Sequence, residues 1–270
     1  MTKFHPGDKV CTLLYQKHIA GSITTATSES SLGGSLDGTL RSIGAFDEQG
    51  LVLMPKGLSF MEAATLGCAG VTAWNALFGQ PGRELKAGQW LLTEGTGGVS
   101  IFAIQFAKAI GARVISTTSS SDKAKLLERL GADHIINYRE VEDWGSKAKE
   151  LAGGIGVDLV VEVAGAATMQ QSVASLKLDG TLSVVGFVGG DAKGQEIPNL
   201  LDAWIKHYTV RGISVGSLAQ MEDMCCAIEA NIGKLRPVLD HRVFTLETIK
   251  EAYEYLYARK NLGKVCIAIE

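Results

Sequence analysis

A glycine cluster between two apolar segments carries the clearest chemical signal in the chain. Residues 91–120 read LLTEGTGGVSIFAIQFAKAIGARVISTTSS, where Gly95, Gly97 and Gly98 follow an apolar run and open a long apolar-periodic segment. In such a strand–turn–helix unit, the first glycine permits a tight turn and the second lets the backbone approach a pyrophosphate at the helix N-terminus. Ser100 stands where the dinucleotide fingerprint has its third glycine, and serine is small enough for close helix–strand packing. The alternative is a glycine turn in an α/β protein that binds no nucleotide.

The residues after the next apolar run indicate which dinucleotide this loop would bind. An NAD site usually presents Asp or Glu at the end of the second strand, about twenty residues on, to bond the ribose 2′-hydroxyl. Here Thr117, Thr118 and Ser119 fill that place, and Lys123 lies just beyond them. A carboxylate would repel a 2′-phosphate, whereas hydroxyls and a lysine can bond it. The sequence therefore predicts NADPH as the cofactor in preference to NAD, with a polar turn and helix cap as the alternative explanation.

These residues need a sheet to position them, and the pattern from about residue 88 onward predicts one. Apolar runs alternate with helical patterns, as in successive βαβ units. The six expected strands are residues 89–94, 112–117, 133–137, 157–165, 181–189 and 208–216. We expect helices over 97–111 and 121–131, the second capped by Ser121 or Asp122. Because the strands are almost continuously apolar, the predicted fold class is α/β, with a doubly wound parallel sheet covered on both faces.

The two ends of the chain differ from this central block. The N-terminal part is rich in Gly, Ser and Thr and contains short candidate strands at 9–15 and 50–55. The C-terminal part has further candidate strands at 237–244 and 264–270, around a helical stretch at 251–259. We therefore expect a nucleotide-binding domain flanked by two pieces of a second, β-rich domain.

Composition argues against several classes of function. The 270 residues carry a formal net charge of −3 and no basic stripe, which argues against general nucleic-acid binding. Apolar stretches are interrupted well short of a membrane span, and the start MTKFHPGDKV lacks the apolar core of a signal peptide. Five scattered cysteines without a CxxC pair fit reduced thiols. We expect a cytoplasmic protein with a small-molecule substrate and without nucleic-acid or membrane partners.

Four motifs together resemble the medium-chain dehydrogenase/reductase superfamily, in its zinc-independent quinone-oxidoreductase-like and alcohol-dehydrogenase-like branch. They are EAATLGCAGVTAWNAL at 62–77, GTGGVS at 95–100, GADHIINYRE at 131–140 and NLGKVCIAI at 261–269. The resemblance implies a remnant of a GroES-like substrate domain at 1–65, a Rossmann dinucleotide-binding domain at 66–235, and a segment at 236–270 that returns to the substrate domain. It also implies hydride transfer between a nicotinamide and a carbonyl, or a conjugated enone or quinone.

The resemblance also assigns cofactor contacts along the chain. Thr72 matches a threonine near the nicotinamide, Tyr138 and Lys123 match contacts to the adenosine phosphate, and residues 186–188 match a backbone stretch facing the carboxamide. The full predicted set is Thr72, Gly95, Thr96, Gly97, Gly98, Val99, Thr118, Ser119, Lys123, Tyr138, Gly186, Phe187, Val188, Gly216, Ser217 and Lys264. The alternatives are core packing for the apolar side chains of 186–188 and an exposed turn for Tyr138. No residue identifies itself as the proton donor, so the catalytic residues stay unassigned.

No bound metal is expected. Cys68 lies in the CAGVT stretch that supplies one ligand in zinc alcohol dehydrogenases, but a catalytic zinc needs three protein ligands, and His5 and His18 sit in no matching motif. We interpret Cys68 as a small buried residue near the nicotinamide pocket. The sequence begins where relatives have a glycine–aspartate–basic–valine strand start, here GDKV at 7–10, so the resemblance lacks the family's opening substrate-domain strands.

Two functional hypotheses follow. The intact glycine loop favours an NADP(H)-dependent reductase with an open substrate pocket. The absent strands favour a nucleotide-fold protein without redox activity, acting as a binding module or a non-redox catalyst. In either case residues 208–215 close the series of strands and should lie at the sheet edge, so we expect a homodimer joined along them. The alternative is that the helix at 217–231 or the C-terminal strand covers this edge.

Overall fold

The computed structural model describes residues 3–191, 194 and 197–269, and the chain divides into two compact units. Unit 1 consists of Met1–Trp74 and Val215–Glu270, and unit 2 consists of Asn75–Ser214. The Rossmann domain was expected at 66–235, but residues 66–74 and 215–235 group with unit 1 in the structure. Helix α3 (Val71–Phe78) contains the first boundary, which explains why no turn residue marks it in the sequence.

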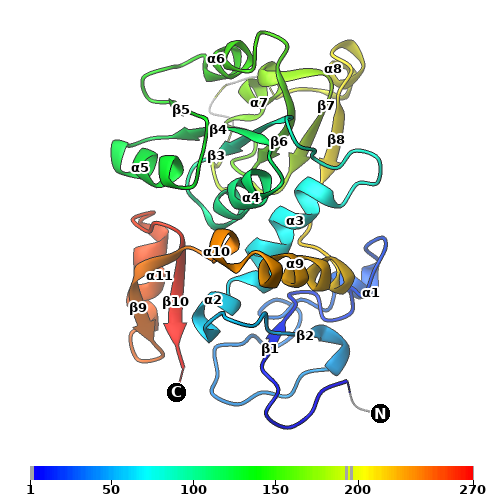
Figure 1. The fold of residues 1–270 in the computed structure, drawn as a ribbon, viewed down its shortest axis with the longest axis vertical. Helices are drawn as coiled ribbons and strands as arrows, with labels where there is room; N and C mark the ends of the chain where they lie inside the picture. The colour runs from blue at the N-terminus through cyan, green and yellow to red at the C-terminus, as the bar shows by residue number, and fades with distance from the viewer. Residues whose placement is uncertain (1–2, 192–193, 195–196, 270) are drawn as a thin grey trace. The chain divides into compact units, whose positions relative to one another are not determined.

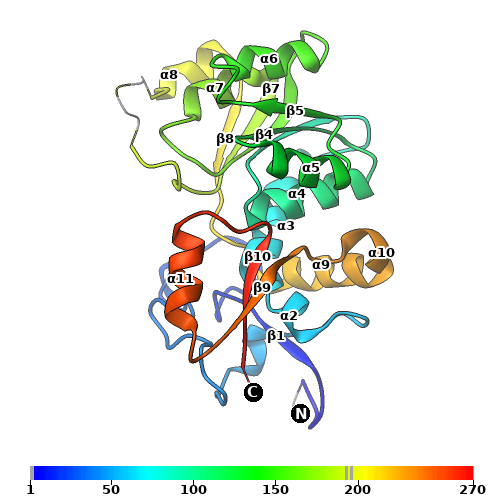
Figure 2. The same ribbon diagram turned by 90° about the vertical axis from the view of Figure 1, so that its left-hand side faces the viewer.

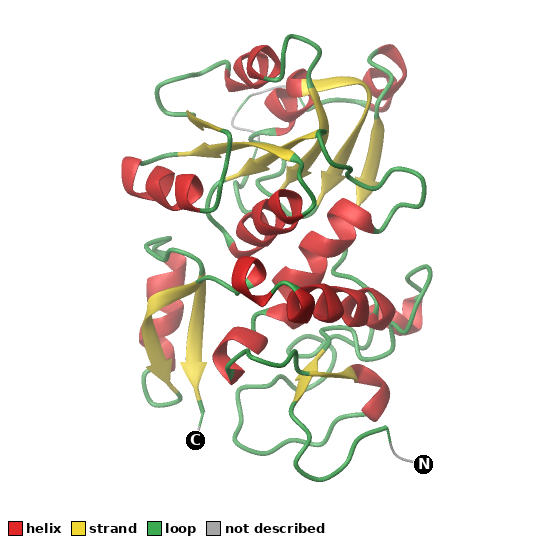
Figure 3. Ribbon diagram, in the orientation of Figure 1, coloured by secondary structure: helices red, strands yellow, loops and turns green. Residues whose placement is uncertain are grey.

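Unit 2 is built around a parallel sheet. In the described part of the chain, this sheet has six strands in the order β5-β4-β3-β6-β7-β8. Its strands are among those drawn in yellow in Figure 3. Its elements are β3 (Trp90–Glu94), α4 (Gly98–Ala109), β4 (Arg113–Thr118), α5 (Ser121–Arg129), β5 (His134–Asn137), α6 (Trp144–Leu151), β6 (Val157–Glu162), α7 (Met169–Ser175), β7 (Leu176–Val184), α8 (Leu200–Ile205) and β8 (Thr209–Gly212). Taken in chain order, this is the 3-2-1-4-5-6 arrangement of doubly wound dinucleotide-binding folds. The predicted fold class is confirmed.

Helices cover both faces of the sheet, which is why its strands read as continuous apolar runs. Figures 1 and 2 show α6 and α7 on one side and α4 on the other. On the first side, Trp144 of α6 and Val173 of α7 pack with strand residues such as Ile115 in one buried cluster. On the other side, Phe102 and Phe106 of α4 are fully buried and stack with ring centroids 5.8 Å apart. Burial on both faces removes the alternating pattern of a half-exposed strand.

The N-cap of α5 differs from the expectation. Ser120, not Ser121 or Asp122, caps this helix, because its hydroxyl accepts the backbone N–H of Lys123 at 3.4 Å. Ser120 has an extended backbone, with φ −153° and ψ 153°, whereas Ser121 already belongs to the helix. An N-cap residue needs this non-helical conformation so that its side chain can reach the first turn. In a run of three serines, sequence alone does not fix which one adopts it.

Unit 1 contains short strands near the positions expected at the two ends of the chain, but its described residues form more helix than strand, so it is not the β-rich domain that the sequence predicts. Its elements are β1 (Val10–Thr12), α1 (Thr25–Ser28), a 3₁₀ turn (Glu48–Gly50), β2 (Leu51–Leu53), α2 (Phe60–Ala63), a π-helical turn (Leu66–Gly70), α9 (Leu218–Ala230), α10 (Ile232–Leu235), β9 (Leu239–Thr245), α11 (Ile249–Tyr257) and β10 (Lys264–Ala268). Strands β1 and β2 pair antiparallel, and β9 and β10 pair parallel. Within the residues that the structure describes, no helix combines the length and apolar character needed to cross a bilayer.

Candidate nucleotide-binding site

The carboxyl edge of the sheet brings most of the predicted cofactor residues together. Strands β3 and β6 are neighbours in the sheet. From β3 the chain winds outward to β4 and β5, and from β6 it winds the other way to β7 and β8, so the junction of β3 and β6 is the topological switch point. Open α/β sheets bind ligands outside the carboxyl ends of the strands at such a point. The glycine loop leaves β3 here, and the backbone N–H of Gly95 donates to the carbonyl of Thr117, the penultimate residue of β4, at 2.8 Å.

The loop has the open backbone that a pyrophosphate requires. Gly95 has φ +67°, a left-handed conformation that favours glycine. A Cβ atom placed on Gly95 or Gly97 would have no heavy atom within 4 Å outside its chain neighbours, so both positions face empty space. Gly97 is the N-cap of α4 and offers no side chain to the first-turn N–H groups. These residues therefore fit a dinucleotide, because the helix N-terminus presents donors without a competing side chain.

Ser100 replaces the third glycine of the fingerprint with a hydrogen bond. It is buried, and its hydroxyl donates to the carbonyl of Glu94 at 2.6 Å. The bond ties the first turn of α4 directly to the end of β3. Close helix–strand approach, which glycine normally allows by its small size, is therefore accompanied here by a specific contact.

The residues expected to select NADPH follow β4 and β5. Thr118 ends β4, and its carbonyl accepts the backbone N–H of Tyr138 at 3.1 Å, which places these two residues side by side. Tyr138 is 44% exposed, as in the alternative of an exposed turn. Thr118 is buried, and in the described part of the chain its hydroxyl has no hydrogen-bond partner. Asp122, the first acid after β4 in the sequence, is exposed, and its carboxylate pairs with the amine of Lys125 at 3.3 Å.

Residues 186–188 form an exposed loop after β7. Phe187 is 84% exposed and Val188 is 65% exposed, so the alternative of core packing is wrong for both. The backbone N–H of Val188 donates to the carbonyl of Val163 at 3.2 Å. Gly165 has φ +86°, and a Cβ atom on it would lie 2.9 Å from Cα of Phe187. The loops after β6 and β7 are thus in close backbone contact at the carboxyl edge.

The other four predicted residues belong to unit 1, and each has a local structural contact. Thr72 donates to the carbonyl of Cys68 at 2.7 Å, and Ser217 caps α9 in a capping box with Gln220. Gly216 is buried so closely that an added Cβ would lie 2.6 Å from a methyl carbon of Val71. The backbone N–H of Lys264 donates to the carbonyl of Val238 at 3.0 Å. Each of these four residues therefore has a structural contact that needs no ligand, and their cofactor roles stay predictions.

Two buried acids at the switch point were missed by the sequence analysis. Glu94 ends β3 and Glu162 ends β6, and both carboxylates are buried. The hydroxyl oxygen of Ser172 lies 3.2 Å from Glu94 Oε1 and 2.5 Å from Glu162 Oε2, so it can donate to either carboxylate. Burial, followed by the negative charge of Glu162, raises the pKa of Glu94 well above its ordinary value. The signal was present in the sequence, because an acid directly ends each of two apolar runs, LLTE and LVVE.

Cys68 is exposed, so its interpretation as a small buried residue was wrong. It lies in the π-helical turn Leu66–Gly70, between the buried residues Leu66 and Ala69. Across residues 3–191, 194 and 197–269, no group of three or more His, Cys, Asp or Glu side chains is placed to hold a metal ion.

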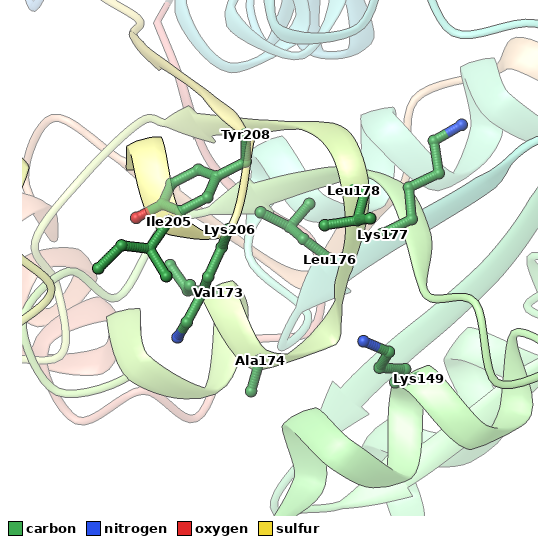
Figure 4. A pocket seen from close by; sticks show the side chains of 9 residues that line it. All are labelled: Lys149, Val173, Ala174, Leu176, Lys177, Leu178, Ile205, Lys206 and Tyr208. Atoms are coloured by element: carbon green, nitrogen blue, oxygen red, sulfur yellow. The ribbon is translucent and has the colours of Figure 1, made fainter. Parts of the chain in front are cut away.

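A cavity of about 280 Å³ lies at the opposite edge of the sheet from the glycine loop. It is lined at the amino ends of β7 and β8, where Leu176 and Tyr208 contribute apolar surface. Figure 4 shows Lys149 and Lys206 on two sides of it, while the amine of Lys177 points away. Lys177 instead pairs with Asp158. Because parallel strands bind nucleotides at their carboxyl ends, this cavity is not the nucleotide site.

The chain is similar to known oxidoreductases along almost its whole length. Residues 98–230 match the family described as zinc-binding dehydrogenase. The zinc-type alcohol dehydrogenase-like protein C1773.06c of Schizosaccharomyces pombe is 40% identical over 99% of this chain and 77% of its own length. The quinone oxidoreductase of Pongo abelii is 30% identical over 74% of this chain and 60% of its own length. A solved structure described as an NAD-dependent alcohol dehydrogenase matches with a TM-score of 0.83 and 29% identity, over 99% of this chain and 77% of that one.

Proposed function

Because the chain belongs to the medium-chain dehydrogenase/reductase superfamily, as an oxidoreductase of the alcohol dehydrogenase and quinone oxidoreductase type, we propose that it binds NADPH and reduces a carbonyl, a conjugated enone or a quinone. The observation that carries the proposal is the glycine loop at the switch point, whose Gly95 and Gly97 face empty space. The bound nicotinamide would supply the hydride. The protein's part is to bind and orient that cofactor.

Each part of the carboxyl edge has a role in this proposal. The first-turn N–H groups of α4 hold the pyrophosphate, because the positive end of the helix dipole favours an anion there. Ser119 and Lys123 bind the 2′-phosphate, with Tyr138 beside it. The exposed backbone of 186–188 would contact the nicotinamide carboxamide. The hydroxyl of Thr118 is buried, so we assign Thr118 a contact through the backbone turn rather than through its side chain.

The preference for NADPH rests on the end of β4. The solved relative described above is NAD-dependent, so the superfamily fold itself does not decide between the cofactors. Residues 117–121 contain no acid, and an NAD site usually needs one to bond the ribose 2′-hydroxyl. Asp122 does not supply this group in our proposal, because its exposed carboxylate already pairs with Lys125.

Fluorescence titration with NADPH and with NADH tests the proposal directly. We expect a lower dissociation constant for NADPH, followed by turnover with quinones or enones as substrates. Equal or reversed dissociation constants would contradict the NADPH assignment. Tight NADPH binding without turnover of any such substrate would instead support the second hypothesis, a binding module or non-redox catalyst.

We also propose that the protein is a homodimer joined along β8. This strand ends the sheet, and Val210 on it is 52% exposed. The N–H of Ile213 donates to the carbonyl of Val184, which ends β7, at 2.8 Å. Successive N–H groups along a strand point to opposite sides, and Val210 is three residues before Ile213, so the N–H of Val210 points toward the open edge. An open edge of this kind invites pairing with a second copy.

Two further proposals concern zinc and cellular location. We propose that no catalytic zinc is needed, because Cys68 is the one residue of this chain that matches a ligand motif of the zinc enzymes. We place the protein in the cytoplasm, because its cysteines are unpaired thiols and a reducing compartment keeps thiols in that state.

A further inference from the structure

The two buried acids at the switch point hold one loop between them. Residues 163–168 connect β6 to α7, and the backbone N–H groups of the first three residues donate to the two carboxylates. Glu94 Oε2 accepts from Val163 at 3.1 Å and from Ala164 at 3.2 Å. Glu162 Oε1 accepts from Ala164 at 2.9 Å and from Gly165 at 2.8 Å. One N–H group, that of Ala164, is therefore shared by both acids.

The hydroxyl groups nearby do not supply enough protons for two carboxylates. Thr168 donates to Glu162 Oε1 at 2.8 Å. Ser172 lies 2.5 Å from Glu162 Oε2 and 3.2 Å from Glu94 Oε1, but its single proton can point to only one of them at a time. The shorter distance gives that proton to Glu162. Glu94 Oε1 is then left without a donor and faces a second carboxylate.

In the described part of the chain, no ion pair compensates the two acids. Glu94 ends β3 and Glu162 ends β6, and the loops 95–97 and 163–168 and helix α7 follow these strands in the chain. None of these five segments contains Lys, Arg or His. Among the ion pairs of the described residues, neither acid appears. Two buried carboxylates that share the Ser172 hydroxyl and the Ala164 N–H cannot both be ionised at moderate cost, because burial disfavours each charge and each charge disfavours the other.

We propose that Glu94 and Glu162 share one proton, carried by Glu94, and that this singly charged pair is a positioning device for the nucleotide loops. As a neutral acid, Glu94 donates to Glu162 and supplies the missing hydrogen bond. The pair then fixes loop 163–168, whose carbonyl at Ala164 accepts the N–H of Gly189 at 2.8 Å and so anchors the loop after β7. Glu94 also directly precedes Gly95. One proton thus links the three loops that form the carboxyl edge around the switch point.

The proposal predicts how stability depends on pH. Because the pKa of Glu94 is raised in the folded protein, its contribution to stability is complete below the unfolded value of about 4.3 and is lost as pH rises through the folded value. A glutamine at this position can donate to Glu162 from its amide and cannot lose the proton. E94Q should therefore unfold at a temperature that falls less between neutral and alkaline pH than that of the wild type.

Infrared difference spectroscopy tests the proton itself. The wild type minus E94Q spectrum at pH 7 should contain a carboxylic-acid C=O band. The same band should shift in frequency in E162Q, because Glu94 stays buried but then donates to an amide oxygen instead of a carboxylate. Absence of the band from the wild type, or a band at unchanged frequency in E162Q, would overturn the shared proton.

Nucleotide titration tests the positioning role, and this arm rests on the proposed function. We expect E94Q to bind NADPH within about twofold of the wild type at pH 7, and E94A to bind at least about tenfold more weakly, because alanine cannot hold the loop. Between pH 7 and 10 the wild-type dissociation constant should rise, by at most about tenfold per pH unit, while that of E94Q stays level. Parallel pH profiles for the two proteins would overturn the positioning role. If the wild type bound NADPH at no pH, the proposed function would fail, while the infrared and unfolding measurements would still decide the proton.

Discussion

Replacing Gly97 by alanine separates the binding role of the glycine loop from its folding role. Gly97 is the N-cap of α4 with φ −72° and ψ 165°, an extended conformation that alanine also adopts. Its added Cβ would have no heavy atom within 4 Å, so the free protein has room for it. The same methyl group would lie where the proposed pyrophosphate approaches the backbone. The substitution should therefore affect the complex much more than the fold.

The magnitudes can be worked out from these two facts. For the free protein, alanine at a compatible position gains about 0.4–1 kcal/mol by restricting the unfolded chain, and loses a comparable amount because alanine is a poorer N-cap than glycine. The net change in unfolding free energy should stay within about 1 kcal/mol. In the complex, an inserted methyl group costs about 1–3 kcal/mol, which corresponds to roughly 5- to 150-fold weaker binding.

Fluorescence titration with NADPH and thermal unfolding measure the two effects on the same samples. Gly233→Ala is a matched control, because Gly233 lies in α10 and its added Cβ would also meet no atom within 4 Å. We expect its dissociation constant to equal that of the wild type. Gly95→Ala should behave differently, since φ +67° costs alanine about 1–2 kcal/mol of stability. If Gly97→Ala bound NADPH as tightly as the wild type, the pyrophosphate would not lie on this loop, and the reasoning would be refuted.

Four further predictions concern other parts of the protein. Lys123→Ala should weaken NADPH binding by about 1–2 kcal/mol and leave NADH binding nearly unchanged in paired titrations. Ser100→Ala should cost about 1–2 kcal/mol of unfolding free energy in a denaturant titration, because the carbonyl of Glu94 loses its buried donor. Val210→Pro should convert the proposed dimer to a monomer in light scattering, whereas Ile213→Pro would also break the bond to β7 and is the less specific test. Elemental analysis should find less than one zinc per chain; one tightly held zinc, lost on Cys68→Ser, would contradict this.

The strands of the sheet were predictable because both of their faces are buried. Trp90–Glu94 and Val157–Glu162 each contain a central apolar run and nearly every residue is buried, so their sequence signal does not depend on knowing the neighbours. Strand β7 was harder, because it begins at Leu176 rather than at residue 181. Leu176 itself is buried in the core, but the pairing with β6 shifts register between Leu176 and Thr181, and Leu178 and Asp179 in between are exposed. An irregular strand start of this kind has no continuous apolar pattern to find.

The parts of the site that were missed depend on contacts between distant segments. Glu94 and Glu162 are ordinary acids when each is taken with its own neighbours, and they become a pair only because β3 and β6 are adjacent in the sheet. Local motifs therefore identified the glycine loop, where the chemistry is contained in a few consecutive residues. They did not identify groups that the sheet order brings together.

The end of β3 connects these observations. The carbonyl of Glu94 holds α4 through Ser100, and its side chain holds the loop after β6. In the usual fingerprint a third glycine lets the helix approach the strand, but a glycine has no group with which to hold it there. In this chain the approach is fixed by a hydrogen bond to the same residue that supports the neighbouring loop. The serine at position 100 is therefore part of the support of the proposed pyrophosphate site, and its departure from the fingerprint is not a sign of a lost nucleotide site.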